Sequence, residues 1–341
     1  MKGRRIINVG IVGAGLIGNK RAEALKHVGG TRLLAVADID WNRALSLSQN
    51  YKCKSYRRWQ DLVKDQKIDV VIIATPNKFL MPIAMAALKN GKHLLCEKPF
   101  GRNFDEAKKI FDAGKKYKRL IQVGFNHRFH AAIREAKKIF DQGQIGKLLF
   151  IRARYGHGGR LGMEKEWRFQ KNISGGGELL DQGVHIIDLC RWFAGDFNEV
   201  YGLAETKFWK TKLDDNTFVL MKNKTVTASF HVSTTNWKNI FSFELFGDRG
   251  FLAVDGKGGS YGEETLVFGR RPKKFGVPKI KIFKFQKDVS WVEEWKNFLS
   301  ALQGKGKIIG DAKDGLEANR IIAAVYESSK TKKPIWLARE R

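Results

Sequence analysis

The chain has 341 residues, of which 43% are hydrophobic, 11% are aromatic and only 6 are proline. This composition excludes a disordered or collagen-like protein, and the length suits two domains better than one. The 63 Lys and Arg residues outnumber the 35 Asp and Glu residues, which gives a net charge of +28. Such a balance favours anionic partners or an acidic small substrate.

Nucleic acid is one anionic partner that a protein of this positive charge could bind. Most lysines, however, fall on the predicted outer faces of helices and strands, and the densest cluster is GRRPKKFGVPK at 269–279. No helix-turn-helix, zinc-finger or aromatic RNA-binding pattern accompanies them. We therefore expect solvated basic faces and no specific nucleic-acid partner.

The cysteines and the apolar runs of the sequence indicate the cellular compartment in which the protein works. Cys53, Cys96 and Cys190 are scattered without CxxC spacing, which is typical of a reducing compartment. MKGRR followed by an apolar run resembles a signal peptide, but the glycine motif within that run explains it better. No stretch reaches the roughly 20 apolar residues of a membrane span. We expect a cytoplasmic protein without a membrane partner.

The first predicted element is an apolar strand from Ile6 to Val12, which runs into GAGLIG at 13–18 and then a helix. A GxGxxG sequence between a strand and a helix predicts a dinucleotide-binding turn. Gly13 permits the tight turn, Gly15 lets the pyrophosphate approach, and Gly18 lets helix and strand pack closely. With Leu16 and Ile17, these glycines are the expected phosphate-binding residues.

A second strand, Leu33 to Ala37, ends at Asp38, which lies 20 residues beyond Gly18. A carboxylate at this point accepts hydrogen bonds from the adenosine ribose hydroxyls and repels a 2′-phosphate. The sequence therefore favours NAD, while nearby Arg43 keeps NADP possible.

Strands and helices continue to alternate as far as LIQVGF at 120–125, which predicts a parallel, doubly wound sheet. Ligands of such sheets bind at the carboxyl ends of the strands. Two of these ends carry polar groups: Thr75 and Asn77 in ATPN, and Glu97 and Lys98 in CEKP. We expect Lys98 to lie at the cofactor cleft, where partial burial would lower its pKa.

The segment GGGELLDQGVHIIDLCRW at 175–192 carries a polar stripe on an apolar helix. At 3.6 residues per turn, Asp181, His185 and Asp188 share one line. The stripe is open to three interpretations: a solvated or core pair, half of a metal site, or a proton-handling pair. No third ligand at helical spacing supports a catalytic metal, so we expect none.

The second half of the sequence is dominated by strand-like alternation joined by short Gly, Asp and Asn turns. We predict an α+β domain with an open, mostly antiparallel sheet over residues 126–341, after a Rossmann domain over 1–125. A late helix at about 311–329 is expected to pack back on the Rossmann domain. An open sheet needs its second face covered, which predicts self-association.

A polar and aromatic segment lies between the first strand of this domain and the helix at 175–192. Its residues suit stacking on a sugar ring and pairing with anionic groups. The expected substrate contacts from this segment are Tyr155, His157, Arg160, Trp167 and Arg168, and Arg128 in GFNHRF is a further expected contact. The basic members indicate a phosphorylated, nucleotide-linked or carboxylated sugar.

In order, GAGLIG, ATPN, EKP and GGx₄DxGxHx₂D resemble the glucose-fructose oxidoreductase, inositol dehydrogenase and MocA family over nearly the whole chain. EKP and DxGxH lie about 80 residues apart. The resemblance implies a catalytic trio of Lys98, Asp181 and His185, with Thr75, Asn77 and Glu97 joining the cofactor site. It also implies homodimers or homotetramers formed through the second-domain sheet.

We therefore expect an NAD-dependent oxidoreductase that interconverts an alcohol and a ketone on a sugar, cyclitol or nucleotide sugar. His185 suits the role of base, because its ordinary pKa lies near neutrality, and Lys98 would hydrogen-bond the same substrate oxygen. The sequence leaves open which of the two carries the proton, because coupled groups titrate together. Two alternatives remain open: an NAD-using glycoside hydrolase or lyase of the same family, and a non-catalytic regulator that senses NAD and a sugar. The presence of all three trio residues favours the dehydrogenase.

Overall fold

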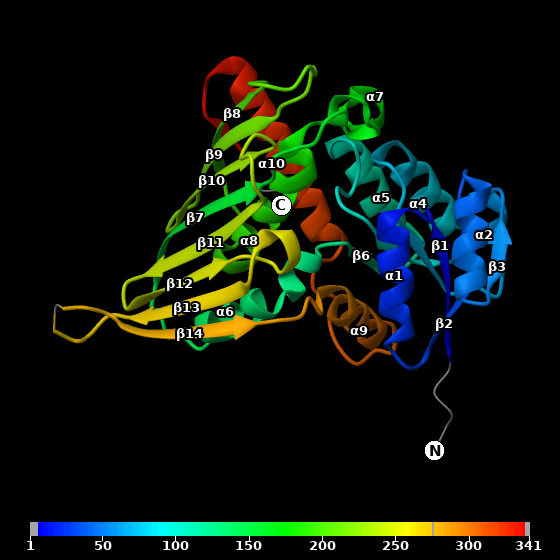
Figure 1. Cartoon of the computed structure of the whole chain (residues 1–341), viewed down its shortest axis with the longest axis horizontal. Helices are drawn as coiled ribbons and strands as arrows, with labels where there is room; N and C mark the ends of the chain where they lie inside the picture. The colour runs from blue at the N-terminus through cyan, green and yellow to red at the C-terminus, as the bar shows by residue number, and fades with distance from the viewer. Residues whose placement is uncertain (1–5, 275, 338–341) are drawn as a thin grey trace. The chain divides into compact units, whose positions relative to one another are not determined.

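A computed structural model describes residues 6–274 and 276–337 (Figure 1). The chain divides into two compact units. Unit 1 comprises the chain up to Asn126 together with Trp291–Asn319, and unit 2 comprises His127–Ser290 and the chain from Arg320 onward. Unit 1 therefore takes in a late segment that lies beyond the predicted boundary at 125/126.

Unit 1 contains a sheet of six parallel strands in the order β3-β2-β1-β4-β5-β6 (Figure 1). The predicted doubly wound parallel sheet is confirmed. The strands are β1 Ile7–Val12, β2 Thr31–Ala37, β3 Lys54–Tyr56, β4 Val70–Ile73, β5 His93–Cys96 and β6 Ile121–Val123.

Helices cover both faces of this sheet. The helical elements along this part of the chain are α1 Leu16–Lys26, α2 Trp41–Asn50, α3 Trp59–Lys64, η1 Asn77–Phe79, α4 Leu80–Lys89 and α5 Phe104–Lys116. Val9 and Ile11 of β1 point into a core shared with α1 and α2. Gly10 faces the other way, where an added Cβ would stand 2.7 Å from Leu62 of α3. Right-handed crossovers place α4 and α5 on that same second face.

A late helix, α9 (Ser290–Leu302), completes the core of unit 1. Its Trp295 and Phe298 are 1% and 0% exposed and pack in the cluster formed by β1, β2, α1 and α2. The chain therefore returns to the Rossmann unit after most of unit 2 has been built.

Unit 2 contains a sheet of nine strands in the order β14-β13-β12-β11-β7-β10-β9-β8-β15 (Figure 1). All neighbours pair antiparallel except β7 and β10. The predicted mostly antiparallel sheet is therefore confirmed. Its strands are β7 Leu148–Gly156, β8 Glu199–Glu205, β9 Asn216–Lys222, β10 Thr227–Ser233, β11 Ile240–Gly247, β12 Gly250–Asp255, β13 Glu264–Arg270, β14 Lys279–Phe285 and β15 Ile335–Trp336.

Helices cover one face of this sheet. The helical elements of the second half of the chain are η2 Asn126–Phe129, α6 Ala131–Asp141, η3 Met163–Lys165, η4 Trp167–Phe169, α7 Lys171–Ser174, the π-helix Leu179–Gly183, α8 Val184–Ala194, η6 Gly259–Tyr261 and α10 Ala312–Thr331. α6 contacts β12 to β14, and α8 contacts β7. At β8, Ser328 of α10 accepts a hydrogen bond from Gly202 N at 3.1 Å. On β9, Val219 and Met221 are buried, whereas Phe218 and Leu220 are 49% and 47% exposed. The other face of the sheet is thus partly apolar and open.

Among the described residues, no helix has both the length and the apolar character needed to cross a bilayer.

Candidate active site

The glycine loop of unit 1 follows β1 and leads into α1. Gly13 has φ +100°, and an added Cβ there would stand 2.4 Å from the carbonyl oxygen of Ala74. At Gly18 an added Cβ would stand 1.9 Å from the carbonyl oxygen of Gly13. Both positions therefore need glycine for the backbone to close, one for the turn and one for helix packing.

Gly15 differs from these two glycines, because nothing lies within 4 Å of an added Cβ. It is the N-cap of α1, whose first turn carries no acidic residue. The open space therefore lies at the positive end of a helix dipole, next to backbone N–H groups. A pyrophosphate fits this place, where a side chain at Gly15 would compete with it.

Asp38 follows β2 beside this loop. Its Oδ2 accepts a hydrogen bond from Ala14 N at 2.6 Å, and its Oδ1 accepts one from Asp40 N at 2.8 Å. These bonds hold the carboxylate against the glycine loop. Arg43 pairs with Asp40 at 3.1 Å between Nε and Oδ2, so one of its donors is directed to that carboxylate.

Thr75 and Asn77 lie just beyond β4, at the carboxyl edge of the sheet. The Oγ1 atom of Thr75 is buried and has no hydrogen-bond partner among the described residues. A buried hydroxyl of this kind fits a site whose ligand completes its hydrogen bonds. Leu16 and Ile39, 73% and 97% exposed, add apolar surface around the same loop.

Glu97, which follows β5, belongs to a buried ion-pair network. Nε of Arg21 donates to its Oε1 at 2.7 Å, and Arg21 also pairs with Glu294 of α9. Burial alone would lower the pKa of Arg21, but the two carboxylates together raise it above its ordinary value. The carboxylate of Glu97 therefore anchors α1 and α9 around the strand end that carries Lys98. Lys98 itself is half-buried at this end of β5.

Asp181 and His185 of unit 2 do not lie on one regular helix. Leu179–Gly183 is a π-helix and α8 begins at Val184, so the 3.6-residue spacing predicted between them does not hold. π-helical turns are rare and occur often at functional sites. The carboxylate of Asp181 lies 3.4 Å from Nε of Arg168.

His185 is 3% exposed, and its ring stacks on that of His127, with centroids 3.7 Å apart and planes 23° apart. His127, from η2, also lies 5.2 Å from the ring of Tyr155. Nζ of Lys257 lies 3.2 Å from Nε2 of His127 and 2.8 Å from Oη of Tyr155. Neither His127 nor Lys257 was predicted as a site residue, because the two follow different strands and only the tertiary fold brings them together.

Arg128 was expected to contact substrate, but its guanidinium is only 4% exposed. Its Nε and Nη2 donate to the two oxygens of Asp188 at 2.7 and 2.6 Å. Asp188 is 0% exposed. This buried pair joins η2 to α8 and gives both residues a structural role.

The glycines at 175–177 provide room for a cap at the start of the segment that carries Asp181 and His185. An added Cβ on Gly177 would stand 2.1 Å from the carbonyl oxygen of Asp214, and one on Gly176 would stand 2.5 Å from Oη of Tyr326. The Asp214 carboxylate accepts from Gly177 N at 3.0 Å and from Leu179 N at 2.8 Å. Asp214 thus acts as the helix cap that the sequence pattern did not reveal.

The remaining expected substrate residues form two groups. Tyr155 and His157 lie on or next to β7, and burial is the main cause that raises the pKa of Tyr155 and lowers that of His157. Arg160 pairs with Glu166 through hydrogen bonds of 2.8 and 2.6 Å on an exposed loop. The guanidinium of Arg168 lies 4.6 Å from the ring centroid of Trp167.

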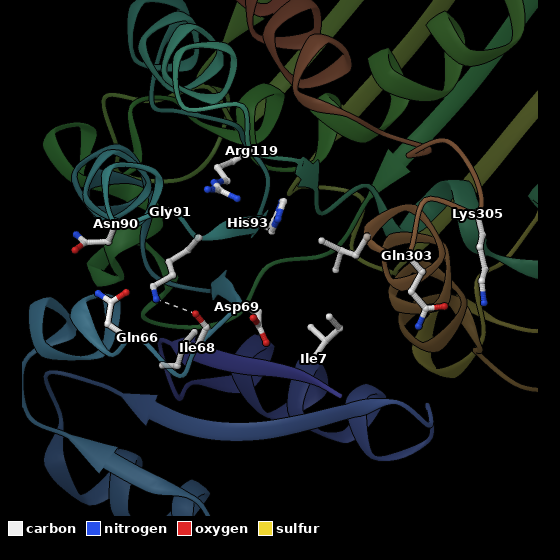
Figure 2. A pocket seen from close by; sticks show the side chains of 12 residues that line it. Ile7, Gln66, Ile68, Asp69, Asn90, Gly91, His93, Arg119, Gln303 and Lys305 are labelled. Atoms are coloured by element: carbon white, nitrogen blue, oxygen red, sulfur yellow. Dashed lines mark hydrogen bonds between the residues drawn. The ribbon is translucent and has the colours of Figure 1, made fainter. Parts of the chain in front are cut away.

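A cavity of about 630 Å³ lies elsewhere in unit 1, at the amino ends of β1, β4 and β5 (Figure 2). Lys92, His93 and Arg119 line it, and Nζ of Lys92 donates to the carbonyls of Asp65 and Ile68 at 2.7 and 2.8 Å. None of the expected site residues lines it. Since parallel strands carry their ligand loops at the carboxyl ends, this cavity is distinct from the cofactor site.

Among the described residues, no three His, Cys, Asp or Glu side chains group as metal ligands.

Comparison with known proteins identifies the class. Residues 7–125 match the model of an oxidoreductase family with an NAD-binding Rossmann fold, and residues 133–253 match the GFO/IDH/MocA C-terminal domain. The chain is thus an oxidoreductase with an NAD-binding Rossmann domain. It belongs to the GFO/IDH/MocA family.

Several curated relatives are dehydrogenases. Inositol 2-dehydrogenase from Rubrobacter xylanophilus is 27% identical over 96% of this chain and 92% of its own length. D-glucoside 3-dehydrogenase from Escherichia coli is 25% identical over 95% and 96%. Levoglucosan dehydrogenase from Pseudarthrobacter phenanthrenivorans is 33% identical, and the match spans 59% of this chain but only 54% of that protein.

A solved structure with the same fold is a levoglucosan dehydrogenase in complex with NADH and levoglucosan. It has a TM-score of 0.90 and 24% sequence identity, and the match covers 98% of this chain and 100% of that one. This likeness supports the fold over both units.

Proposed function

We propose that the protein is an NAD-dependent dehydrogenase that oxidises a ring alcohol of a sugar, cyclitol or nucleotide sugar to a ketone, and reduces the ketone in reverse. The main support is the glycine loop. An added Cβ at Gly13 or Gly18 would clash with the backbone, whereas Gly15 faces open space. The inositol, D-glucoside and levoglucosan dehydrogenases among the relatives support the substrate class. NAD is favoured over NADP because Asp38 is held beside this loop.

The residues that would hold NAD are the glycine loop with Leu16 and Ile17, Asp38, Thr75 and Asn77. Bound NAD would supply the hydride acceptor for the alcohol carbon. Glu97 contributes indirectly, because its carboxylate is directed to Arg21 and fixes the strand end before Lys98. Arg43, which already pairs with Asp40, lies at the edge of this set.

Proton transfer would be carried out by Lys98, Asp181 and His185. His185 is buried, and in its neutral form it would accept the hydroxyl proton of the substrate. Lys98, as a cation, would stabilise the developing alkoxide, and such a donor contributes about 3 kcal/mol. Asp181 would orient a substrate hydroxyl, with its charge balanced by Arg168.

Substrate contacts would come from Tyr155, His157, Trp167 and Arg168, with Arg160 at the exposed rim. The proposed partner of the protein is a second copy of the same chain. The uncovered sheet face supports this, since Phe218 and Leu220 are exposed beside a hollow of about 560 Å³. The protein would therefore form a homodimer or homotetramer through this face.

The experiment is a panel of polyols, sugars and nucleotide sugars incubated with NAD, with NADH absorbance as the readout. We expect NADH with at least one compound, and a loss of about 100-fold or more in Lys98→Met and His185→Gln. Lys109→Met and His27→Gln, which change exposed residues, are the matched controls. No NADH with any member, or full activity in both site variants, would contradict the proposal.

A further inference from the structure

Lys257, which follows β12, lies among aromatic side chains of unit 2. The centroids of the Tyr155 and Tyr261 rings lie 4.6 and 4.3 Å from its Nζ. The same atom lies 2.8 Å from Oη of Tyr155 and 3.2 Å from Nε2 of His127. Aromatic faces stabilise an ammonium, so the surroundings favour a charged Lys257 in this position.

The contact with His127 determines the form of that imidazole. An ammonium has three donors and no lone pair, so Nε2 of His127 must accept the hydrogen bond. A doubly protonated imidazole has no acceptor, so a charged Lys257 at this distance requires a neutral His127 with its proton on Nδ1. Lys257 would repel a further proton on His127.

The effect extends to His185 because the two imidazoles are stacked. Their centroids lie 3.7 Å apart, and each residue is 3% exposed. At a buried site of low dielectric constant, the repulsion between positive charges is much stronger than in water. A proton on His185 would put positive charge against an imidazole that already accepts from Lys257.

The other charged groups around this stack bear on its protonation. Two carboxylates, one from the π-helix and one from α8, are paired with guanidinium groups: Asp181 with Arg168 at 3.4 Å, and Asp188 with Arg128. Glu178, at the start of the π-helix, is 4% exposed. A negative charge on its carboxylate would favour protonation of the stacked imidazoles. His130 also faces the stack, with its ring centroid 5.5 Å from that of His127, and its Nδ1 lies 3.0 Å from the carboxylate of Glu264. Two phenols lie close by as well. Burial and nearby carboxylates raise the pKa of Tyr155, and that of Tyr261 to about 12, which keeps both uncharged.

We infer that Lys257 is a positioning residue that keeps the His127–His185 stack neutral, so that His185 is ready to accept the proton of the substrate hydroxyl. This inference rests on the proposed dehydrogenase function for its consequence. Its physical content, the protonation of two imidazoles, is a property of the protein alone. Oxidation of the alcohol would then proceed at lower pH than it would without this cation.

The first arm of the test is a histidine NMR titration of the full chain without substrate. The protein is labelled at the imidazole nitrogens and carbons, and the signals are assigned with His127→Gln and His185→Gln. In the wild type we expect His127 to carry its proton on Nδ1. In Lys257→Met, His127 and His185 should take up a proton at higher pH than in the wild type. Lys257→Arg should restore the wild-type titration, and Lys284→Met, which removes an exposed lysine, should not change it.

The second arm is kcat/KM against pH with a substrate found in the panel. The ratio of wild type to Lys257→Met should rise to about tenfold on the acid side and approach one on the alkaline side. A purely structural role would lower the rate by the same factor at every pH.

The two arms separate the possible failures. An unchanged titration in a folded Lys257→Met protein would overturn the inference, as would a wild-type His127 protonated on Nε2. The latter measurement does not depend on Lys257→Met and decides the matter even if that variant does not fold. Absence of NADH formation with every compound would instead contradict the proposed function and leave the titration result standing.

Discussion

Arg128 and Asp188 form a bidentate ion pair inside unit 2, with Nε and Nη2 of the guanidinium 2.7 and 2.6 Å from the two carboxylate oxygens. The neighbouring residue His127 stacks on His185, one turn before Asp188. Two consecutive residues of η2 thus contact two residues of α8. The ion pair therefore fixes the alignment in which the two imidazoles meet.

Breaking this pair should destabilise the protein. Arg128→Met leaves the Asp188 carboxylate buried without its partner, which typically lowers the free energy of unfolding by about 3–5 kcal/mol. Urea denaturation should show this loss, and Arg128→Met combined with Asp188→Leu should recover much of it. If Arg128→Met kept full stability and raised KM alone, Arg128 would be a substrate contact after all.

Gly15 and Gly18 should respond differently to a side chain. Gly15→Val places its side chain in open space, so the unliganded protein should keep its Tm while Kd for NAD rises about tenfold or more. Gly18→Ala should lower Tm, because its Cβ would stand 1.9 Å from the carbonyl oxygen of Gly13. Calorimetry and thermal unfolding of both variants measure this. Unchanged NAD binding in Gly15→Val would contradict a pyrophosphate at this loop.

Asp38 should control the choice between NAD and NADP. Asp38→Ser removes the negative charge that opposes a 2′-phosphate and keeps a hydroxyl for the ribose. The ratio of kcat/KM with NAD to that with NADP should fall by about tenfold or more. Arg43→Ala in the same background should reverse part of the gain with NADP. An unchanged ratio in Asp38→Ser would show that another residue reads the ribose.

Stability should fall as the solution becomes acidic. Burial is the first cause that lowers the pKa of His93, His157 and His231, and nearby arginines add to it. The unfolded chain therefore binds protons more readily than the folded one, so this contribution is complete above the ordinary histidine pKa of about 6.5 and is lost as pH falls below it. The urea midpoint should drop between about pH 7.5 and pH 5.5. His93→Gln should make that drop smaller, and a drop of equal size would exclude His93 as a contributor.

The fold followed from local patterns that tolerate little ambiguity. GAGLIG between a strand and a helix defined the start of the Rossmann sheet, and alternating strands defined the sheet of unit 2. Short or irregular pieces were missed, such as the three-residue β3, because three residues show no periodicity. α9 was missed as part of the Rossmann core because the packing of Trp295 and Phe298 depends on contacts with residues far away in sequence.

The candidate site could be predicted only where a motif carries its chemistry. Gly15 and Asp38 lie where their motif indicates, but the 3.6-residue period could not predict the π-helix at Leu179–Gly183. No sequence pattern reveals that Arg128 pairs with Asp188, because the two residues lie 60 positions apart in the chain. Lys257 follows the sheet strand β12, and only the tertiary fold brings it to His127.

Net hydride transfer from a substrate alcohol is tested most directly with a substrate deuterated at the carbon that is oxidised. After incubation with NAD, mass spectrometry and NMR of the nicotinamide should find that deuterium in NADH, in equal amount to the ketone formed. His185→Gln should reduce this transfer by about 100-fold or more. Bond cleavage in the substrate without labelled NADH would contradict the account and favour a hydrolase or lyase that uses NAD only transiently.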